Sequence, residues 1–172
     1  MDYCKQMVAE RKRLETVLGN AALETPDQAV SFADALTRII WNHQMLGLIY
    51  QYYADDAILK GPTGNRIVGQ EGIQNEFLAM IAAFPDMRVH ITATFASVHK
   101  EGGFMVYQRS YCEGTNSGMS IYGPPTGNQL NEQNSMGQTV YLIQPVEGQW
   151  RVVREYSIRS MMTITRLLKN EL

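Results

Sequence analysis

The sequence predicts a single α+β domain, in which helices are followed along the chain by a long antiparallel sheet. The chain has 172 residues, of which 45% are hydrophobic and 19% charged, as in an ordinary globular domain. Apolar residues recur at helical spacing up to about residue 86 and alternate with a period of two after it. Helices that are segregated from an antiparallel meander are typical of the α+β class.

The first half of the chain predicts three helices. Residues 1–18 carry only a thin apolar stripe, so this helix needs another surface to pack against. The clearest helix starts at residues 25–28, which combine a capping box with a proline in the first turn. We expect it to bend near Gly47 and to run on to Tyr53. A third helix follows from Gln70 until Pro85 stops it.

The second half predicts strands joined by turns. The expected strands cover residues 57–68 (a short hairpin), 87–95, 104–113, 138–144 and 149–158. A polar, glycine-rich loop over residues 114–131 interrupts them, and a loop of this length usually indicates either function or mobility. A last helix is expected over residues 161–169. We therefore expect one domain over residues 1–172, with a helical extension over 1–24 and a core over 25–170.

Charge and composition argue against several classes of function. The 15 basic and 17 acidic residues are well mixed and give a net charge of −2, which does not favour nucleic acid as a partner. No apolar run approaches the length of a membrane span, and the N-terminus is too polar for a signal peptide. Two cysteines cannot form a disulfide framework, so a reducing cytoplasm is the simplest location.

A series of short motifs spans about residues 30 to 168. The motifs are Ile40-Trp41-Asn42, Tyr52-Tyr53-Ala54-Asp55-Asp56, Gly61-Pro62, Gly69-Gln70-Glu71-Gly72-Ile73, Ala83-Phe84-Pro85-Asp86, Gly114-Thr115-Asn116, Pro125-Thr126-Gly127, and Arg154-Glu155-Tyr156 leading to Arg159. In this order they resemble the nuclear transport factor 2-like superfamily, in its SnoaL-like (polyketide cyclase-like) branch. The resemblance implies a cone-shaped barrel, in which a curved mixed or antiparallel sheet wraps around the long helix and holds a pocket. It also implies a homodimer.

The same resemblance implies a catalytic aspartate late in the last strand, and this sequence departs from it. Ser160 stands where we align that aspartate, and Asn116 stands where the family usually has histidine. A serine hydroxyl without a base cannot take a proton from carbon at neutral pH. Asp56 and His90 remain as candidate acid/base residues. Their alternatives are a turn or cap residue for Asp56 and a surface or dimer contact for His90.

Several residues are candidates for binding a ligand. Arg109 could anchor a carboxylate or polarise a carbonyl, or it could form an exposed cross-strand ion pair. Tyr111 shares its face of the strand. Tyr156 supplies an aromatic wall if its side of the last strand faces inward. Further candidates are Trp41, Tyr53, Asn116 and Ser160.

The resemblance also implies a small, apolar ligand with a carbonyl or ester group. The sequence leaves two functions open: a cyclase- or isomerase-like enzyme that works by proton transfer, and a non-catalytic ligand-binding or dimerisation module on the same fold. No metal site is expected, because His43, His90 and His99 do not have ligand spacing. No cofactor motif is present either, since the glycine-rich turns lack the Gly-Lys-Ser/Thr of a P-loop.

Overall fold

The computed structural model describes residues 2–20, 22–61, 64–159 and 161–170. Its helices are α1 (Tyr3–Gly19), α2 (Pro26–Trp41), a 3-10 turn (Leu46–Leu48), α3 (Ile49–Tyr52), α4 (Gln70–Ala83), α5 (Glu132–Ser135) and α6 (Met161–Lys169). Its strands are β1 (Tyr53–Lys60), β2 (Arg66–Val68), β3 (Arg88–Val98), β4 (Phe104–Thr115), β5 (Gln129–Leu130), β6 (Gly137–Val146) and β7 (Gln149–Arg159). Helices and antiparallel strands are largely separate along the chain, which confirms the α+β class.

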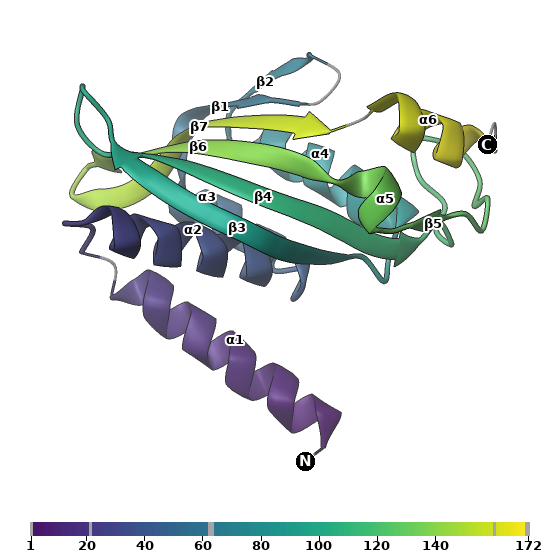
Figure 1. Ribbon diagram of the computed structural model, residues 1–172, viewed down its shortest axis with the longest axis horizontal. Coiled ribbons are helices and arrows are strands. Elements are labelled where there is room, and N and C mark those ends of the chain that lie inside the picture. Colours follow the sequence, from purple (N-terminus) through teal and green to yellow (C-terminus); the bar gives the residue numbers. More distant parts are fainter. Residues whose placement is uncertain (1, 21, 62–63, 160, 171–172) are drawn as a thin grey trace.

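The strands form one curled sheet, with α3 and α4 behind it in the view of Figure 1. The strand order is β2-β1-β7-β6-β4-β3, and β5 pairs with β4. The neighbours β1 and β7 run parallel, whereas the other strand pairs are antiparallel. The predicted curved, mixed sheet is thereby confirmed. We call the side that packs against α2 and α4 the inner face and the opposite side the outer face.

Helix α2 begins where its local sequence predicts. The Thr25 hydroxyl accepts a hydrogen bond from the Gln28 amide at 3.3 Å, and Gln28 Oε1 accepts one from the Thr25 amide at 2.9 Å. The expected continuation to Tyr53 is wrong, because α2 stops at Trp41. Gln44 then adopts a left-handed conformation with φ of 54°, and a 3-10 turn and the short α3 follow.

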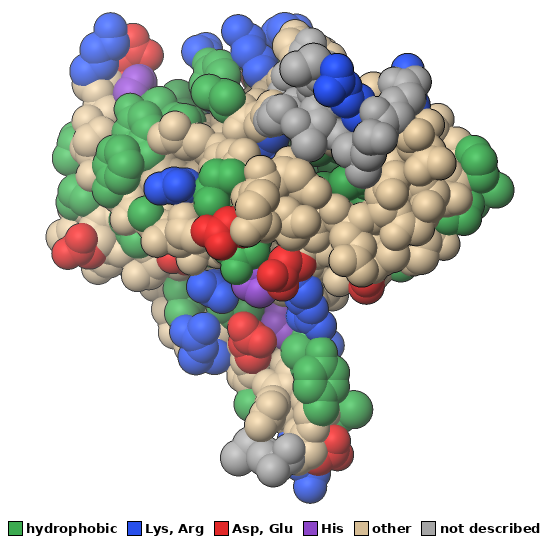
Figure 2. All heavy atoms as spheres, turned by 45° about the vertical axis from the view of Figure 1, so that its right-hand side comes forward, with side chains coloured by type: hydrophobic (Ala, Val, Ile, Leu, Met, Phe, Trp, Pro, Cys, Tyr) green, Lys and Arg blue, Asp and Glu red, His purple; other side chains and the backbone are tan. Residues whose placement is uncertain are grey.

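Helix α1 packs against α2 through Leu14 and Leu18, which are both buried. Its N-terminal half projects from the body and forms the stalk at the bottom of Figure 2. Tyr3, at the end of this stalk, accepts a hydrogen bond from Arg88 through its phenol oxygen at 2.8 Å. The C-terminal part of the apolar stripe of α1, Leu14 and Leu18, is therefore covered within its own chain.

The inner face changes character along β4, and this change positions the site. Phe104 and Val106 are buried in the larger apolar core beneath α2, whereas Gln108 and Ser110 continue the same face with polar side chains. A second apolar cluster closes the far end of the molecule and includes residues of α4, β3 and α6. The polar stretch of the sheet lies between these two cores. No helix in the described ranges is long and apolar enough to cross a membrane.

Candidate functional site

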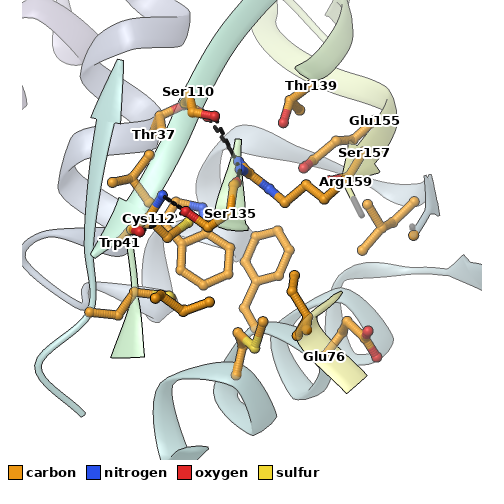
Figure 3. A pocket seen from close by; sticks show the side chains of 18 of the residues that line it. Thr37, Trp41, Glu76, Ser110, Cys112, Ser135, Thr139, Glu155, Ser157 and Arg159 are labelled. Carbon is orange, nitrogen blue, oxygen red and sulfur yellow. Dashed lines mark hydrogen bonds between the residues drawn. The ribbon is translucent and has the colours of Figure 1, made fainter. Parts of the chain in front are cut away.

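A cavity of about 290 Å³ lies between the polar part of the inner face and the second apolar cluster. This volume is near the lower end of the roughly 300–1,000 Å³ that is typical of small-molecule sites. Strands β4, β6 and β7 form one wall, and residues of α2, α4, β3 and α6 form the other (Figure 3). The site is thus polar on one side and largely apolar on the other.

The register of the sheet arranges the polar wall as a grid. Tyr141 of β6 lies directly opposite Glu155 of β7, and the next row pairs Thr139 with Ser157. In the row after that, Gly137 of β6 lies between Ser110 of β4 and Arg159 of β7. Since side chains two residues apart share a face, these rows all point into the cavity.

Glu155 is the most chemically distinctive residue of the cavity. Its side chain is only 5% exposed, and its Oε2 accepts a hydrogen bond from the Tyr53 phenol at 2.7 Å. Burial raises the pKa of the Glu155 carboxyl from 4.5 to about 7, although the Tyr53 hydrogen bond and the charge of Arg159 both oppose the rise. A carboxyl with a pKa near neutrality can act as both acid and base at physiological pH.

Arg159 crosses the sheet toward β4 (Figure 3). Its guanidinium donates to Ser110 O at 3.2 Å, to Ser110 Oγ at 2.8 Å and to Ser135 O at 2.8 Å. Gly137 permits this path, because a Cβ at that position would overlap Arg159 Cγ. These bonds use three of the five N–H groups of a guanidinium, so Arg159 keeps donors for a ligand oxygen.

The opposite wall is mostly apolar and aromatic, although Glu76 of α4 also lines the cavity. The ring centroids of Trp41 and Phe77 lie 4.5 Å apart, and Met80, Met87 and Val89 continue the wall. Ile121 and Tyr122 of the long loop also line the cavity, although Ile121 is 82% exposed. A flat or branched apolar ligand could pack against this wall while its polar groups face Glu155 and Arg159.

Two of the predicted binding residues lie at the cavity or next to it. Trp41 lines the apolar wall. Tyr53 is buried and holds Glu155 in place. Asn116 is also buried, but its side chain binds the Ala83 carbonyl and Thr126 and so anchors the long loop.

The other candidates point away from the cavity. Asp56 is exposed on β1. His90 stacks on Tyr111 with a centroid distance of 4.8 Å, and its Nε2 lies 2.9 Å from Glu113 Oε2. Arg109 is exposed on β4 between two residues of the inner face. The Tyr111 and Arg109 side chains therefore belong to the outer face.

Tyr156 also lies on the outer face, where its ring is 5.6 Å from Lys60 Nζ. The aromatic wall expected from it required an inward orientation, and the inward residues of this strand are Glu155, Ser157 and Arg159 instead. Ser160 lies outside the described residues. The sequence reasoning thus missed Glu155 and Arg159 as residues of the cavity, although both fall in the last motif of the family series.

Cys112 lines the cavity as a protonated thiol, because burial raises its pKa. Across the part of the chain that the structure describes, no group of three or more histidine, cysteine or acidic residues could hold a metal ion.

The sequence matches the SnoaL-like polyketide cyclase family over residues 32–137, which is more than half of the chain. The chain belongs to this family. The matched region includes most of α2 and all of β3 and β4, whereas Glu155 and Arg159 lie beyond it. No relative was found among curated proteins.

Solved structures resemble this SnoaL-like domain in fold. A protein of Jannaschia sp. CCS1, provisionally described as a SnoaL-like polyketide cyclase, is 14% identical with a TM-score of 0.64, and the match covers 87% of this chain and 96% of that one. A provisionally described polyketide cyclase from Acidithiobacillus ferrooxidans is 20% identical with a TM-score of 0.61, covering 88% and 100%. Nuclear transport factor 2 from Cryptosporidium parvum is 13% identical with a TM-score of 0.54, covering 74% and 87%.

Proposed function

We propose that this SnoaL-like domain binds a small, partly apolar carbonyl compound and catalyses proton transfer on it, with Glu155 as acid and base. The observation that carries the proposal is the buried carboxyl of Glu155 in the cavity, with its pKa raised to about 7. The matched family is described as SnoaL-like polyketide cyclase, and a polyketide carries the carbonyl groups that this chemistry needs. The class of reaction is an intramolecular aldol-type cyclisation or an isomerisation.

The chemical step uses groups that the cavity already holds. The Tyr53 phenol occupies Oε2 of Glu155, which leaves Oε1 to take a proton from the carbon next to a carbonyl. The electron pair of the broken C–H bond forms an enolate, whose oxygen accepts hydrogen bonds from the remaining donors of Arg159. The enolate carbon then attacks a second carbonyl of the same molecule, and Glu155 returns its proton to the new alkoxide. In an isomerisation the proton returns to a different carbon.

Glu155 replaces Asp56 and His90 as the proposed base because of its position. A general base must come within hydrogen-bonding distance of the proton that it removes. Asp56 is exposed, and His90 is stacked on Tyr111 beside Glu113 on the outer face. Neither can reach a ligand in the cavity, whereas the carboxyl of Glu155 lines it.

Proton NMR in heavy water tests the function directly. A panel of ketones, lactones and aromatic β-dicarbonyl compounds is incubated with the wild type, and loss of the α-proton signal reports abstraction. We expect Glu155→Gln to slow this exchange by about 100-fold or more, because a positioned general base contributes about 10²–10⁴-fold. Asp56→Asn is the matched control, since it removes an exposed carboxylate, and should leave the rate unchanged.

The other results of this experiment separate the competing functions. Undiminished exchange in Glu155→Gln would show that Glu155 is not the base. Line broadening of the ligand without exchange in the wild type would point to a non-catalytic binding module. Absence of both for every compound would contradict the cavity as a carbonyl-binding site.

We further propose that the protein forms a homodimer through the outer face of the sheet. Phe95 and Tyr107 stack there with centroids 4.8 Å apart, and His90 and Tyr111 stack in the same way. Phe95 is 59% exposed and Ile158 is 64% exposed. Exposed aromatic and aliphatic side chains on one sheet face favour pairing with a second such face.

A further inference from the structure

A series of buried and partly buried hydrogen bonds connects Asp34 to the cavity. The Oδ1 atom of Asp34 accepts a hydrogen bond from Gln108 Nε2 at 2.8 Å. A carboxylate can only accept hydrogen bonds, so the NH₂ group of the Gln108 side chain must face Asp34. The Oε1 atom of Gln108 therefore faces Thr37. The hydroxyl of Thr37 donates to Gln108 Oε1 at 2.9 Å. The side chains of Thr37 and Gln108 are both buried.

These hydrogen bonds determine the direction of the next one, between Thr37 and Tyr141. Thr37 Oγ1 lies 3.0 Å from the phenol oxygen of Tyr141, and either oxygen could be the donor in that contact alone. A threonine hydroxyl has one proton, and Gln108 Oε1 already receives it. Tyr141 is therefore the donor. The opposite direction would leave the oxygen of Gln108, whose side chain is only 1% exposed, without its donor, and such a loss is costly in a buried site.

Tyr141 thus faces the cavity as a hydrogen-bond acceptor and not as a donor. Its single proton is used on Thr37, and burial raises its pKa, so the phenol does not ionise. Its oxygen keeps lone pairs but has no proton left for a ligand. Tyr141 lies directly opposite Glu155 in the grid, next to the reacting atoms of the proposed chemistry.

We infer that Tyr141 determines specificity by accepting a hydrogen bond from a hydroxyl group of the ligand. The ligand class is therefore a hydroxy-carbonyl compound: its alcohol or phenol O–H faces Tyr141, and its carbonyl faces Arg159. A ligand that places a carbonyl or ether oxygen against Tyr141 brings two acceptors together and loses affinity. This inference rests on the proposed binding of a carbonyl compound in the same cavity.

Three probes with the same ring system test the direction of this hydrogen bond. Isothermal titration calorimetry compares 2-naphthol, which can donate, with 2-methoxynaphthalene and 2-naphthaldehyde, which can only accept. We expect the wild type to bind 2-naphthol about tenfold more tightly than the other two, which is the typical effect of an unpaired polar group. Tyr141→Phe should lose the preference for 2-naphthol over 2-methoxynaphthalene. Tyr107→Phe, which changes a tyrosine of the outer face, should keep the preference.

Thr37→Val separates this role from a structural one. Valine has nearly the shape of threonine but cannot accept, so the proton of Tyr141 becomes available to the ligand. We expect the preference to reverse in this variant, with 2-naphthaldehyde bound more tightly than 2-methoxynaphthalene or 2-naphthol. A merely structural role of Thr37 would weaken all three probes to the same degree.

Binding results that differ from these expectations would contradict either the role of Tyr141 or the proposed function. Equal binding of the three probes by the wild type, or a hydroxyl preference that persists in Tyr141→Phe or Thr37→Val, would overturn the inference and leave the proposed function standing. Failure of every probe to bind the wild type would contradict the cavity as a ligand site, and with it both claims.

Discussion

Glu155 combines two opposing tendencies in one side chain. Burial favours its neutral form, whereas the hydrogen bond from Tyr53 and the nearby charge of Arg159 favour the carboxylate. The balance leaves its pKa at about 7, where small changes in pH or in a ligand move the proton. A carboxyl that is needed only for stability would gain from full pairing, so this intermediate state fits a residue that exchanges protons.

The raised pKa of Glu155 predicts how stability depends on pH. The folded state keeps the proton up to about pH 7, whereas the unfolded state loses it near pH 4.5. Stability from this group is therefore complete below pH 4.5 and is lost as the pH rises to 7. A pKa difference of this size corresponds to about 3 kcal/mol at most. Because Glu155→Gln lacks the titration, we expect it to gain up to this amount relative to the wild type between pH 4.5 and pH 8.

Urea unfolding of both proteins at pH 5 and pH 8 measures this relative gain. Comparing the two pH values removes any effect of the glutamine on the free energy of unfolding that does not depend on pH. Asp56→Asn should follow the wild type at both pH values, because Asp56 is exposed. Parallel pH dependence in the wild type and Glu155→Gln would contradict the raised pKa.

At the scale of elements, a bulge in β7 decides which residues enter the cavity. Leu142 pairs with Arg154 and Ile143 with Val152, so Val153 is an extra residue on β7. Val152 is buried, and regular alternation would also turn Arg154 and Tyr156 inward. The extra residue reverses this parity, and Glu155, Ser157 and Arg159 face inward instead.

The side chain of Arg159 passes over Gly137 of β6, so we can predict the effect of replacing this glycine. An alanine there would place a methyl group against Arg159 Cγ and 2.6 Å from the carbonyl oxygen of Ile158. We expect Gly137→Ala to lower the free energy of unfolding by about 1–3 kcal/mol, as overpacking typically does. The cost should be smaller in an Arg159→Ala background, because one of the two clashes is then absent.

Chemical denaturation of the two single variants and the double variant measures this coupling. Gly19→Ala is the control, since a Cβ at Gly19 meets nothing within 4 Å. It should be neutral or slightly stabilising. Strictly additive effects of Gly137→Ala and Arg159→Ala would show that the two residues do not interact.

At the scale of the whole molecule, the two faces of the sheet have different roles. The inner face holds the core and the cavity, and the outer face leaves Phe95, Ile158 and stacked aromatic rings exposed. We expect the wild type to be a dimer by light scattering at micromolar concentration. Phe95→Glu should convert it to a monomer, because a charge cannot be buried at such an interface without a partner.

Leu78→Glu provides the matched control for the dimer. Leu78 is also about half exposed, but it lies on α4, which packs on the opposite side of the sheet. This variant should stay dimeric. A monomeric wild type, or a dimeric Phe95→Glu, would rule out association through the outer face.

The sequence by itself determined the features that depend on neighbouring residues. The capping box at Thr25 and Gln28 starts α2 because its hydrogen bonds are local. The alternation of apolar and polar residues placed the long strands within a few residues of their observed ends. The motif series also led to the family and its curved sheet.

Only the tertiary structure decided how the site is assembled. The period-two pattern cannot reveal an extra residue such as Val153, because a bulge is defined by pairing with another strand. Arg109, Tyr111 and Tyr156 consequently looked as plausible as Glu155 until the register was known. The pKa of Glu155 likewise depends on burial, which raises it, and on the hydrogen bond from Tyr53, which lowers it and comes from about a hundred residues away in the chain. Electrostatic interactions and strand pairing join residues that are far apart in the sequence, so the spacing of residues along the chain does not reveal them.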